Sequence, residues 1–265
     1  MPQLPFLTPI GLPFTELLSV DSTNNYAFEQ IHDGLAQHGA TFFAHEQLKG
    51  KGQRGKTWAA KKANNLVLSI VIDPRPLLLN QQFQLSACVA VSAWEFFSGY
   101  AGDATTIKWP NDIYWQDRKA GGILIENVVS VSNHQSAVDS QQSDSWKWAV
   151  AGIGININQT IFPEEIKNPV SLKQITGKQY NPVELAKEFC SILNKNFTEL
   201  ITKGFENIYS LYLDHLYKKN QVLKFKAGPR IFEATVKTVS LSGSLVLQHS
   251  IEEEFDFGQV EWLIN

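Results

Sequence analysis

The stretch "GKGQRG", residues 50–55, has the glycine spacing G-x-G-x-x-G, and the residues after it decide between two kinds of fold. In a dinucleotide-binding fold such a loop opens a long helix, and an acidic residue ends the next strand. Asp73 does end the next apolar run, but only "KTWAAKKAN", residues 56–64, separates the loop from that run. This segment is too short for a crossover helix, so the sequence excludes the dinucleotide-binding fold.

The same loop has the composition of an anion-binding loop. Glycines let the backbone approach a ligand closely and expose its N–H groups. Positive charge is added by Lys49, Lys51, Arg54 and Lys56. Phosphate is the anion that such a loop suits best, and a solvated basic turn is the alternative that the loop alone leaves open.

The apolar pattern predicts an α+β protein in two parts. Helices are expected over 20–39, 81–98 and 181–201, and strands over 40–44, 65–73, 121–129 and 148–157. The first helix is expected to bury Ala27, Phe28, Ile31 and Leu35. From Asn220 onward the chain shows short strands broken by turns, which is typical of a small β-barrel. We therefore expect a larger domain at 1–218 and a small β domain at 219–265.

Composition narrows the class of protein. The 265 residues carry a net charge of −3, which gives no global attraction to nucleic acid or to an acidic membrane. Both cysteines, Cys88 and Cys190, lie in apolar helical patterns, as reduced core residues of a cytoplasmic protein do. No stretch is long and apolar enough to span a membrane. We expect a cytoplasmic protein that binds neither nucleic acid nor membrane.

Two further stretches carry polar residues where strands end. "KWPND", residues 108–112, is followed by Lys119 at the start of another strand, and Gly121 and Gly122 leave room for a ligand beside it. "GIGININ", residues 152–158, carries two asparagines, which need hydrogen-bond partners on an apolar strand. Taken singly, the asparagines are better explained by a structural role, and an ordinary hairpin with a surface lysine is the alternative for the first stretch.

Together these stretches resemble the biotin protein ligases, also called biotin–[acetyl-CoA-carboxylase] ligases. The motifs occur in the family's order as "DSTN" at 21–24, "EQLKGKGQRGKTW" at 46–58, "KWPNDIY" at 108–114, "KAGGILIE" at 119–126 and "GIGININ" at 152–158. The C-terminal "FGQVEW" is similar to part of the family's SH3-like domain. The resemblance implies a class II aminoacyl-tRNA-synthetase-like catalytic domain, a mixed sheet with helices, followed by a small SH3-like β-barrel.

The resemblance also implies an activity. Family members use ATP and Mg²⁺ to convert biotin to biotinyl-5'-AMP, and they transfer the biotin to a lysine of a biotin carboxyl carrier protein. By position, the catalytic residues are Lys119, Lys51 and Arg54, and Asp112 is the expected magnesium ligand. The matching substrate-binding positions are Ser22, Thr23, Asn24, Gln47, Gly50, Gly52, Gln53, Gly55, Lys56, Trp58, Lys108, Trp109, Asn111, Asp112, Gly121, Gly122, Gly154 and Asn156.

These residue types fit the chemistry that the resemblance implies. A carboxylate must attack an anionic α-phosphate, and a fixed ammonium at Lys119 opposes their repulsion. The loop departs from the family's common pattern G-R-G-R-x-x-R, because Lys51, Gln53 and Lys56 stand where arginines are usual. Lysine lacks the bidentate fork of arginine, and glutamine lacks its charge. We therefore hypothesise that this loop retains the adenylate less tightly than an arginine-rich loop does.

Other functions remain open at this point. A lipoate or octanoate ligase or transferase of the same fold is the nearest alternative, and a non-catalytic biotin sensor is another. The first motif begins at residue 21, so we expect a monofunctional ligase without a DNA-binding domain. The acidic run "EEEFD", residues 252–256, is interpreted as a solvated loop that suits no nucleic acid. A homodimer is as compatible with the sequence as a monomer.

Overall fold

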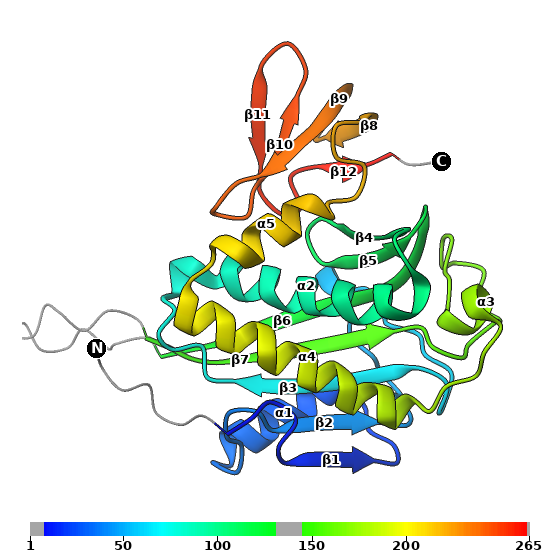
Figure 1. Ribbon diagram of the computed structural model, residues 1–265, viewed down its shortest axis with the longest axis vertical. Coiled ribbons are helices and arrows are strands. Elements are labelled where there is room, and N and C mark those ends of the chain that lie inside the picture. The colour runs from blue at the N-terminus through cyan, green and yellow to red at the C-terminus, as the bar shows by residue number, and fades with distance from the viewer. Residues whose placement is uncertain (1–7, 131–144, 264–265) are drawn as a thin grey trace, which may run out of the picture.

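The computed structural model describes residues 8–130 and 145–263. Its larger part is built on one mixed sheet of seven strands in the order β1-β2-β3-β7-β6-β5-β4 (Figure 1). Strands β1 and β2 pair in parallel, and the other neighbours pair antiparallel. The strands are β1 (Phe14–Leu17), β2 (Thr41–Ala44), β3 (Leu66–Ile72), β4 (Thr105–Lys108), β5 (Asp112–Trp115), β6 (Arg118–Ser130) and β7 (Ser145–Ile155).

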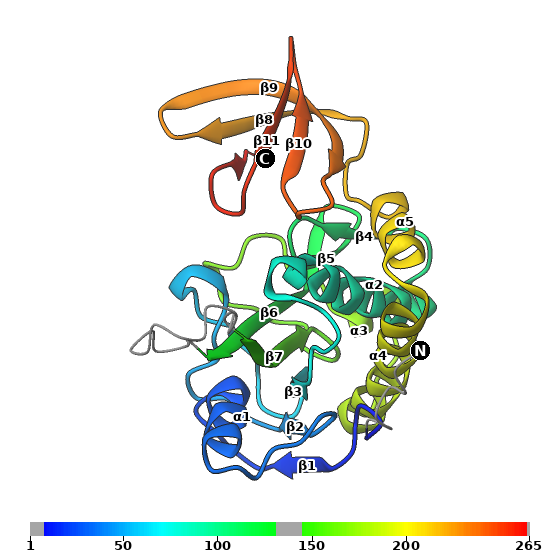
Figure 2. The same cartoon turned by 90° about the vertical axis from the view of Figure 1, so that its left-hand side faces the viewer.

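Helices cover both faces of this sheet. Helix α1 (Thr23–His32) packs on one face against β2, β3 and β7. On the other face lie α2 (Gln82–Ala101) and α4 (Pro182–Lys203), which pack against each other, as Figure 2 shows from the side. Strand β3 is buried along its whole length between these layers, as its continuous apolar run predicts.

The ends of the helices test the sequence-based expectations. Helix α4 begins as expected, because the side chain of Asn181 accepts a hydrogen bond from the backbone N–H of Val183 and Pro182 occupies the first helical position. Helix α1 is shorter than expected. It ends at His32 because Gly34 adopts φ +69°, which turns the chain out of the helix. Leu35 is therefore 71% exposed, and the expectation that it lies on a buried helix face is wrong.

The segment after the glycine loop contains no helix, as expected. Residues Gln53–Gly55 form a single 3₁₀ turn (η1), and the chain from residue 56 to the start of β3 at Leu66 is irregular. Two short helices, α3 (Leu172–Thr176) and α5 (Glu206–Asp214), were not expected from the sequence, and a further 3₁₀ turn (η2, Leu79–Gln81) precedes α2. The exclusion of a dinucleotide-binding βαβ unit is thus confirmed.

The C-terminal part is an antiparallel sheet in the order β11-β10-β9-β8-β12. Its strands are β8 (Val222–Ala227), β9 (Arg230–Val239), β10 (Leu245–Gln248), β11 (Glu252–Phe255) and β12 (Glu261–Trp262). The acidic run at 252–255 is therefore an edge strand and not a loop, because it pairs with β10. Its Phe255 is buried, whereas the three glutamates of the run stay at the surface. The expected domain boundary at residue 218 stays a prediction.

Two contacts fix this sheet to the larger part. The indole Nε1 of Trp109 donates to the carbonyl of Gly243 at 2.9 Å, and the hydroxyl of Tyr209 donates to the carbonyl of Val239. The C-terminal sheet therefore has a defined position over the end of β4 and β5 (Figure 1). Among the helices in the described part of the chain, none is both long enough and apolar enough to cross a bilayer.

Candidate active site

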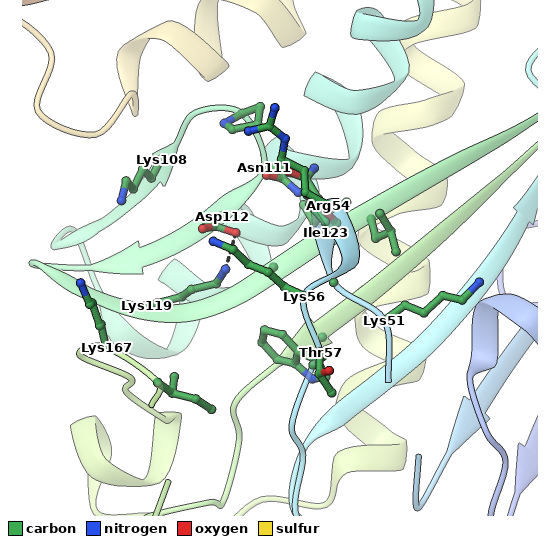
Figure 3. Close-up of a pocket in the computed structure, with 18 of the residues that line it drawn as sticks. Lys51, Arg54, Lys56, Thr57, Lys108, Asn111, Asp112, Lys119, Ile123 and Lys167 are labelled. Atoms are coloured by element: carbon green, nitrogen blue, oxygen red, sulfur yellow. Dashed lines mark hydrogen bonds and ion pairs between the residues drawn. The ribbon is translucent and has the colours of Figure 1, made fainter. Parts of the chain in front are cut away.

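A cavity of about 1580 Å³ lies where the glycine loop, the β4–β5 hairpin, β6, β7 and the C-terminal sheet meet (Figure 3). Of the residues singled out from the sequence, those that line it are Ser22, Thr23, Asn24, Gln47, Lys51, Gly52, Gln53, Arg54, Lys56, Trp58, Lys108, Trp109, Asn111, Asp112, Lys119, Gly122, Gly154 and Asn156. These residues come from five separate segments of sequence, so the fold brings the motifs to one place.

Three of the expected glycines lie outside the lining of this cavity. Gly50 borders a second cavity, which Trp58 also lines. Gly55 adopts φ +74° at the end of the loop's 3₁₀ turn, a conformation that favours glycine. Gly121 packs against β7, because a Cβ there would lie 2.9 Å from the carbonyl oxygen of Gly154. Their expected role in substrate binding stays a prediction.

An ion pair between Lys119 and Asp112 lies in the cavity. The Lys119 Nζ is 2.6 Å from Asp112 Oδ1, and both side chains are partly exposed to the cavity. Gly122 faces this pair, since a Cβ there would lie 3.3 Å from Asp112 Oδ1 and 3.4 Å from Lys119 Nζ. Glycine at this position therefore keeps the two charged groups accessible to a ligand.

Backbone contacts hold Lys119 at this place. Its N–H donates to the carbonyl of Asn168 at 2.8 Å, and its carbonyl accepts from the N–H of Val170 at 2.9 Å. The Asn156 side chain braces the same segment by donating to the Val170 carbonyl at 3.1 Å. Asn111 has a comparable use, because its side-chain amide donates to the carbonyl of Ile123. Both asparagines thus position the strands around Lys119.

A polar wall closes the other end of the cavity, and it is formed by Thr23, Asn24, Gln47 and Ser69. The Thr23 Oγ1 lies 3.0 Å from Gln47 Oε1, and Ser69 Oγ lies 2.7 Å from Thr23 Oγ1 and 2.5 Å from Asn24 Oδ1. The Thr23 N–H also donates to Gln47 Oε1 at 2.8 Å, which fixes that atom as the amide oxygen.

The wall has fewer protons than contacts. Three oxygen–oxygen contacts share the two hydroxyl protons of Thr23 and Ser69. Because Asn24 Nδ2 donates to Glu126 Oε2 at 2.7 Å, the Asn24 oxygen must face Ser69 and supplies no proton. These oxygens therefore keep spare acceptor capacity, which suits a ligand that brings N–H groups.

Two glycines of β7 make room for site residues. A Cβ at Gly152 would overlap the Asn24 side chain, and a Cβ at Gly154 would overlap the indole of Trp58. The Trp58 Nε1 is buried and donates to no acceptor in the described part of the chain. Lys119 Nζ lies 6.0 Å from the Trp58 ring. Trp58 thus presents a flat apolar surface beside the ion pair.

Lys108 is a partly buried cation of the cavity, and aromatic side chains surround its ammonium. Its ammonium donates to the hydroxyl of Tyr114 at 3.1 Å and lies 4.7 Å from that ring, 5.9 Å from the Tyr217 ring and 5.6 Å from the Trp262 ring. Burial lowers the pKa of Lys108 to about 8, with nearby Lys119 and Lys56 adding to the effect and Asp112 opposing it. An anion bound here would stabilise the charged form.

Two loop cations point to different partners. Lys51 Nζ lies 4.0 Å from Glu126 Oε1. Arg54, which has φ 55°, donates from Nη2 to the carbonyl of Gly258 at 3.2 Å, and its guanidinium lies 5.4 Å from the Phe257 ring. The expected catalytic role of both residues is untested, and Arg54 contacts the C-terminal sheet.

Sequence reasoning missed several residues at the site. Ser69 belongs to the polar wall, Glu126 accepts from Asn24 of that wall, and Phe257 and Trp262 bring the C-terminal sheet to the cavity. A hydroxyl inside the apolar run "NLVLSIVID" was a signal for Ser69. Glu126, Phe257 and Trp262 lie within stretches that carried the resemblance, but their contacts depend on the strand register and on the packing of the two sheets.

The residues fit a magnesium ion that arrives with a nucleotide. Within the described residues no group of three or more His, Cys, Asp and Glu side chains is placed to hold a metal. Mg²⁺ is commonly bound by one or two carboxylates together with substrate phosphates and water. Asp112, the carboxylate beside Lys119, is suited to that role.

The chain is similar to known ligases. Residues 17–138 match the model of the Biotin/lipoate A/B protein ligase family. The chain is 29% identical to the Bifunctional ligase/repressor BirA of Bacillus spizizenii over 196 residues. The aligned region covers 73% of this chain and 56% of that protein. Over 238 residues it is 26% identical to a Biotin--[acetyl-CoA-carboxylase] ligase of Paracoccus denitrificans, 88% of this chain and 92% of that one. The chain thus spans about half the length of the repressor-type relatives that it matches.

The fold is that of solved ligase structures. The biotin protein ligase from Aquifex aeolicus in complex with biotin and ATP superposes with a TM-score of 0.74 at 24% identity, covering 94% of this chain and 97% of that one. The match includes both the mixed sheet with its helices and the C-terminal antiparallel sheet. The expected α+β architecture is confirmed.

Proposed function

We propose that this chain, which carries a Biotin/lipoate A/B protein ligase family domain at residues 17–138, is an ATP-dependent biotin protein ligase. It would activate biotin as biotinyl-5'-AMP and transfer the biotin to a lysine of a biotin carboxyl carrier protein. The observation that carries this proposal is the cavity itself, which has an acceptor-rich wall at one end and a lysine-rich region at the other.

The polar wall favours biotin over the other acids of the family. The ureido ring of biotin brings two N–H donors, and these meet spare acceptors on Thr23 Oγ1 and Gln47 Oε1. The dithiolane ring of lipoate and the alkyl chain of octanoate carry no N–H group. Either acid would leave the wall short of a proton, and an unsatisfied buried polar contact costs about 1–3 kcal/mol.

The first chemical step joins the two ends of the cavity. An oxygen of the biotin carboxylate attacks the α-phosphorus of ATP, the bond from that phosphorus to the bridging oxygen breaks, and pyrophosphate leaves. The Lys119 ammonium is placed to lie between the carboxylate and the α-phosphate and to oppose their repulsion. A magnesium ion bound with ATP at Asp112 would neutralise charge on the departing pyrophosphate.

The remaining residues have supporting roles. Trp58 offers a flat surface for the adenine, and the buried ammonium of Lys108 offers charge to the phosphate tail. The glycine loop can cover the mixed anhydride and keep water from it. In the second step the amine of the acceptor lysine attacks the biotinyl carbonyl, and AMP leaves.

Partners and location follow from this activity. The acceptor would be a carrier domain of a biotin-dependent carboxylase, and such a reaction belongs in the cytoplasm. The C-terminal sheet supplies part of the cavity through Phe257 and Trp262, so we propose that it takes part in nucleotide binding.

The experiment that tests the proposal follows both steps by mass spectrometry. The purified protein is incubated with ATP, Mg²⁺ and biotin, and the mixture is analysed for biotinyl-5'-AMP before and after a carrier domain is added. We expect the adenylate first and then a biotinylated carrier lysine. Formation of a lipoyl or octanoyl adenylate, with none from biotin, would contradict the proposal.

A further inference from the structure

Glu126 lies outside the lining of the cavity, yet it contacts residues from two sides of the biotin site. We infer that Glu126 is a positioning residue that couples the glycine loop to the polar wall, an inference that rests on the proposed function. It acts through Asn24 on the wall and through Lys51 on the loop.

The contact with Asn24 sets the polarity of the wall. The Asn24 side chain is buried, and Gly152 leaves the space that it occupies. Because the Glu126 carboxylate can only accept, it holds the Asn24 amide with its nitrogen outward and its oxygen toward Ser69. Turning the amide over would place two oxygens against each other at Glu126. The acceptor-rich character of the wall thus depends on Glu126.

The contact with Lys51 reaches the loop. The second carboxylate oxygen of Glu126 lies 4.0 Å from Lys51 Nζ, and both side chains are partly exposed. Lys51 forms a backbone bridge with Thr57, so its position follows that of the whole loop. A charge on Glu126 therefore favours the loop position in which Lys51 lies beside Glu126.

The contacts form one continuous path. It runs from Gln47 to Thr23, Ser69, Asn24 and Glu126, and it ends at Lys51. Its two ends, Gln47 and Lys51, lie on either side of Gly50 at the base of the glycine loop. A ligand that donates to Thr23 or Gln47 changes the hydrogen bonds of this path, so binding at the wall and closure of the loop are linked.

Two substitutions separate the two contacts. Glu126→Ala removes both, whereas Glu126→Gln keeps an amide oxygen for Asn24 and removes the charge that attracts Lys51. The matched control is Glu46→Gln. This substitution removes a carboxylate that pairs with Lys62 at 3.1 Å, and neither residue lines the cavity. Biotin affinity is measured by calorimetry without ATP, and release of the biotinyl-adenylate is measured by its dissociation rate.

We expect Glu126→Ala to raise the Kd for biotin by about 10-fold to 100-fold, because it leaves a buried amide without its acceptor. Glu126→Gln should change that Kd less than Glu126→Ala does, and it should speed adenylate release by about 2-fold to 5-fold. Glu46→Gln should leave both quantities within about twofold of the wild-type values.

A double substitution distinguishes coupling from a purely structural role. In a Lys51→Ala background, Glu126→Gln should no longer change adenylate release, because the charge has lost its partner. An equal effect of Glu126→Gln with and without Lys51, or an unchanged biotin Kd in Glu126→Ala, would overturn the inference. If the wild-type protein binds no biotin, the proposed function fails, and this inference fails with it.

Discussion

The ammonium of Lys119 lies 2.6 Å from a carboxylate oxygen of Asp112 across the β5–β6 pair. A lysine held in this way is fixed in direction before any ligand arrives, and electrostatic stabilisation of a reacting anion depends on such fixed charges. The absence of a side chain at Gly122 keeps the pair open to the cavity.

Replacement of Lys119 should remove the charge between the two reacting anions. We expect Lys119→Met to lower the rate of adenylate formation by about 100-fold to 1000-fold. The affinity for biotin measured without ATP should change much less, because the wall that binds the ureido ring lies at the other end of the cavity. Single-turnover formation of biotinyl-5'-AMP measures the first quantity, and a rate within tenfold of the wild-type rate would contradict the role given to Lys119.

Substitutions at the two β7 glycines, Gly152 and Gly154, should each affect the KM of a different substrate. Gly152→Ala is expected to displace Asn24 and raise the KM for biotin, and Gly154→Ala is expected to displace Trp58 and raise the KM for ATP. Each should also destabilise the protein by about 1–3 kcal/mol through overpacking. Gly99→Ala is the control, because a Cβ there meets no atom within 4 Å and alanine favours the helix. Equal effects of Gly152→Ala and Gly154→Ala on both KM values would count against the assignment.

The pH dependence should report the buried ammonium of Lys108. Burial lowers its pKa to about 8, so Lys108 is charged at pH 7 and loses its charge as the pH rises through 8. We expect the KM for ATP to rise between pH 7 and about pH 9 for this reason. Lys108→Met should have a higher KM for ATP at pH 7 and should lose this rise, whereas Lys203→Met, at an exposed position, should keep it.

The same shift has a consequence for stability with a definite sign. Between pH 8 and the ordinary lysine value of 10.5, the unfolded chain binds a proton at Lys108 that the folded protein has released. The free energy of unfolding should therefore rise with pH over this interval because of Lys108. A difference in melting temperature between the wild type and Lys108→Met that is the same at pH 7.5 and pH 10 would contradict this.

The composition of the glycine loop should set the lifetime of the intermediate. Gln53 lines the cavity and carries no charge where arginine is usual in the family that the sequence resembles. We expect Gln53→Arg to slow dissociation of biotinyl-5'-AMP by about tenfold, since a guanidinium adds a charge-assisted hydrogen bond to phosphate. Release of radiolabelled adenylate measures this rate, and an unchanged rate would refute the hypothesis.

The sequence predicted the site best where a motif lies within one hairpin or loop. Lys119 and Asp112 are close in sequence, and the hairpin formed by their two strands brings them together. The absence of a crossover helix after Gly55 was likewise predictable, because the segment between Gly55 and β3 is too short to hold one.

Contacts between distant segments were not predictable in the same way. Glu126 meets Asn24 only because α1 packs over β7, and Trp262 meets Lys108 only because the C-terminal sheet lies over β4. The apolar spacing of Leu35 fitted the helix before it, but the left-handed conformation of Gly34 ended that helix first. Local pattern is a weaker guide where tertiary packing or a glycine decides the path of the chain.

The most direct test of the central claim is ATP–pyrophosphate exchange measured with biotin, lipoate and octanoate in parallel, with Lys119→Ala as control. The account predicts exchange that depends on biotin and is lost in Lys119→Ala, because the wall selects N–H donors and Lys119 supports the attack on the α-phosphate. Exchange with lipoate or octanoate and none with biotin, or undiminished exchange in Lys119→Ala, would contradict it.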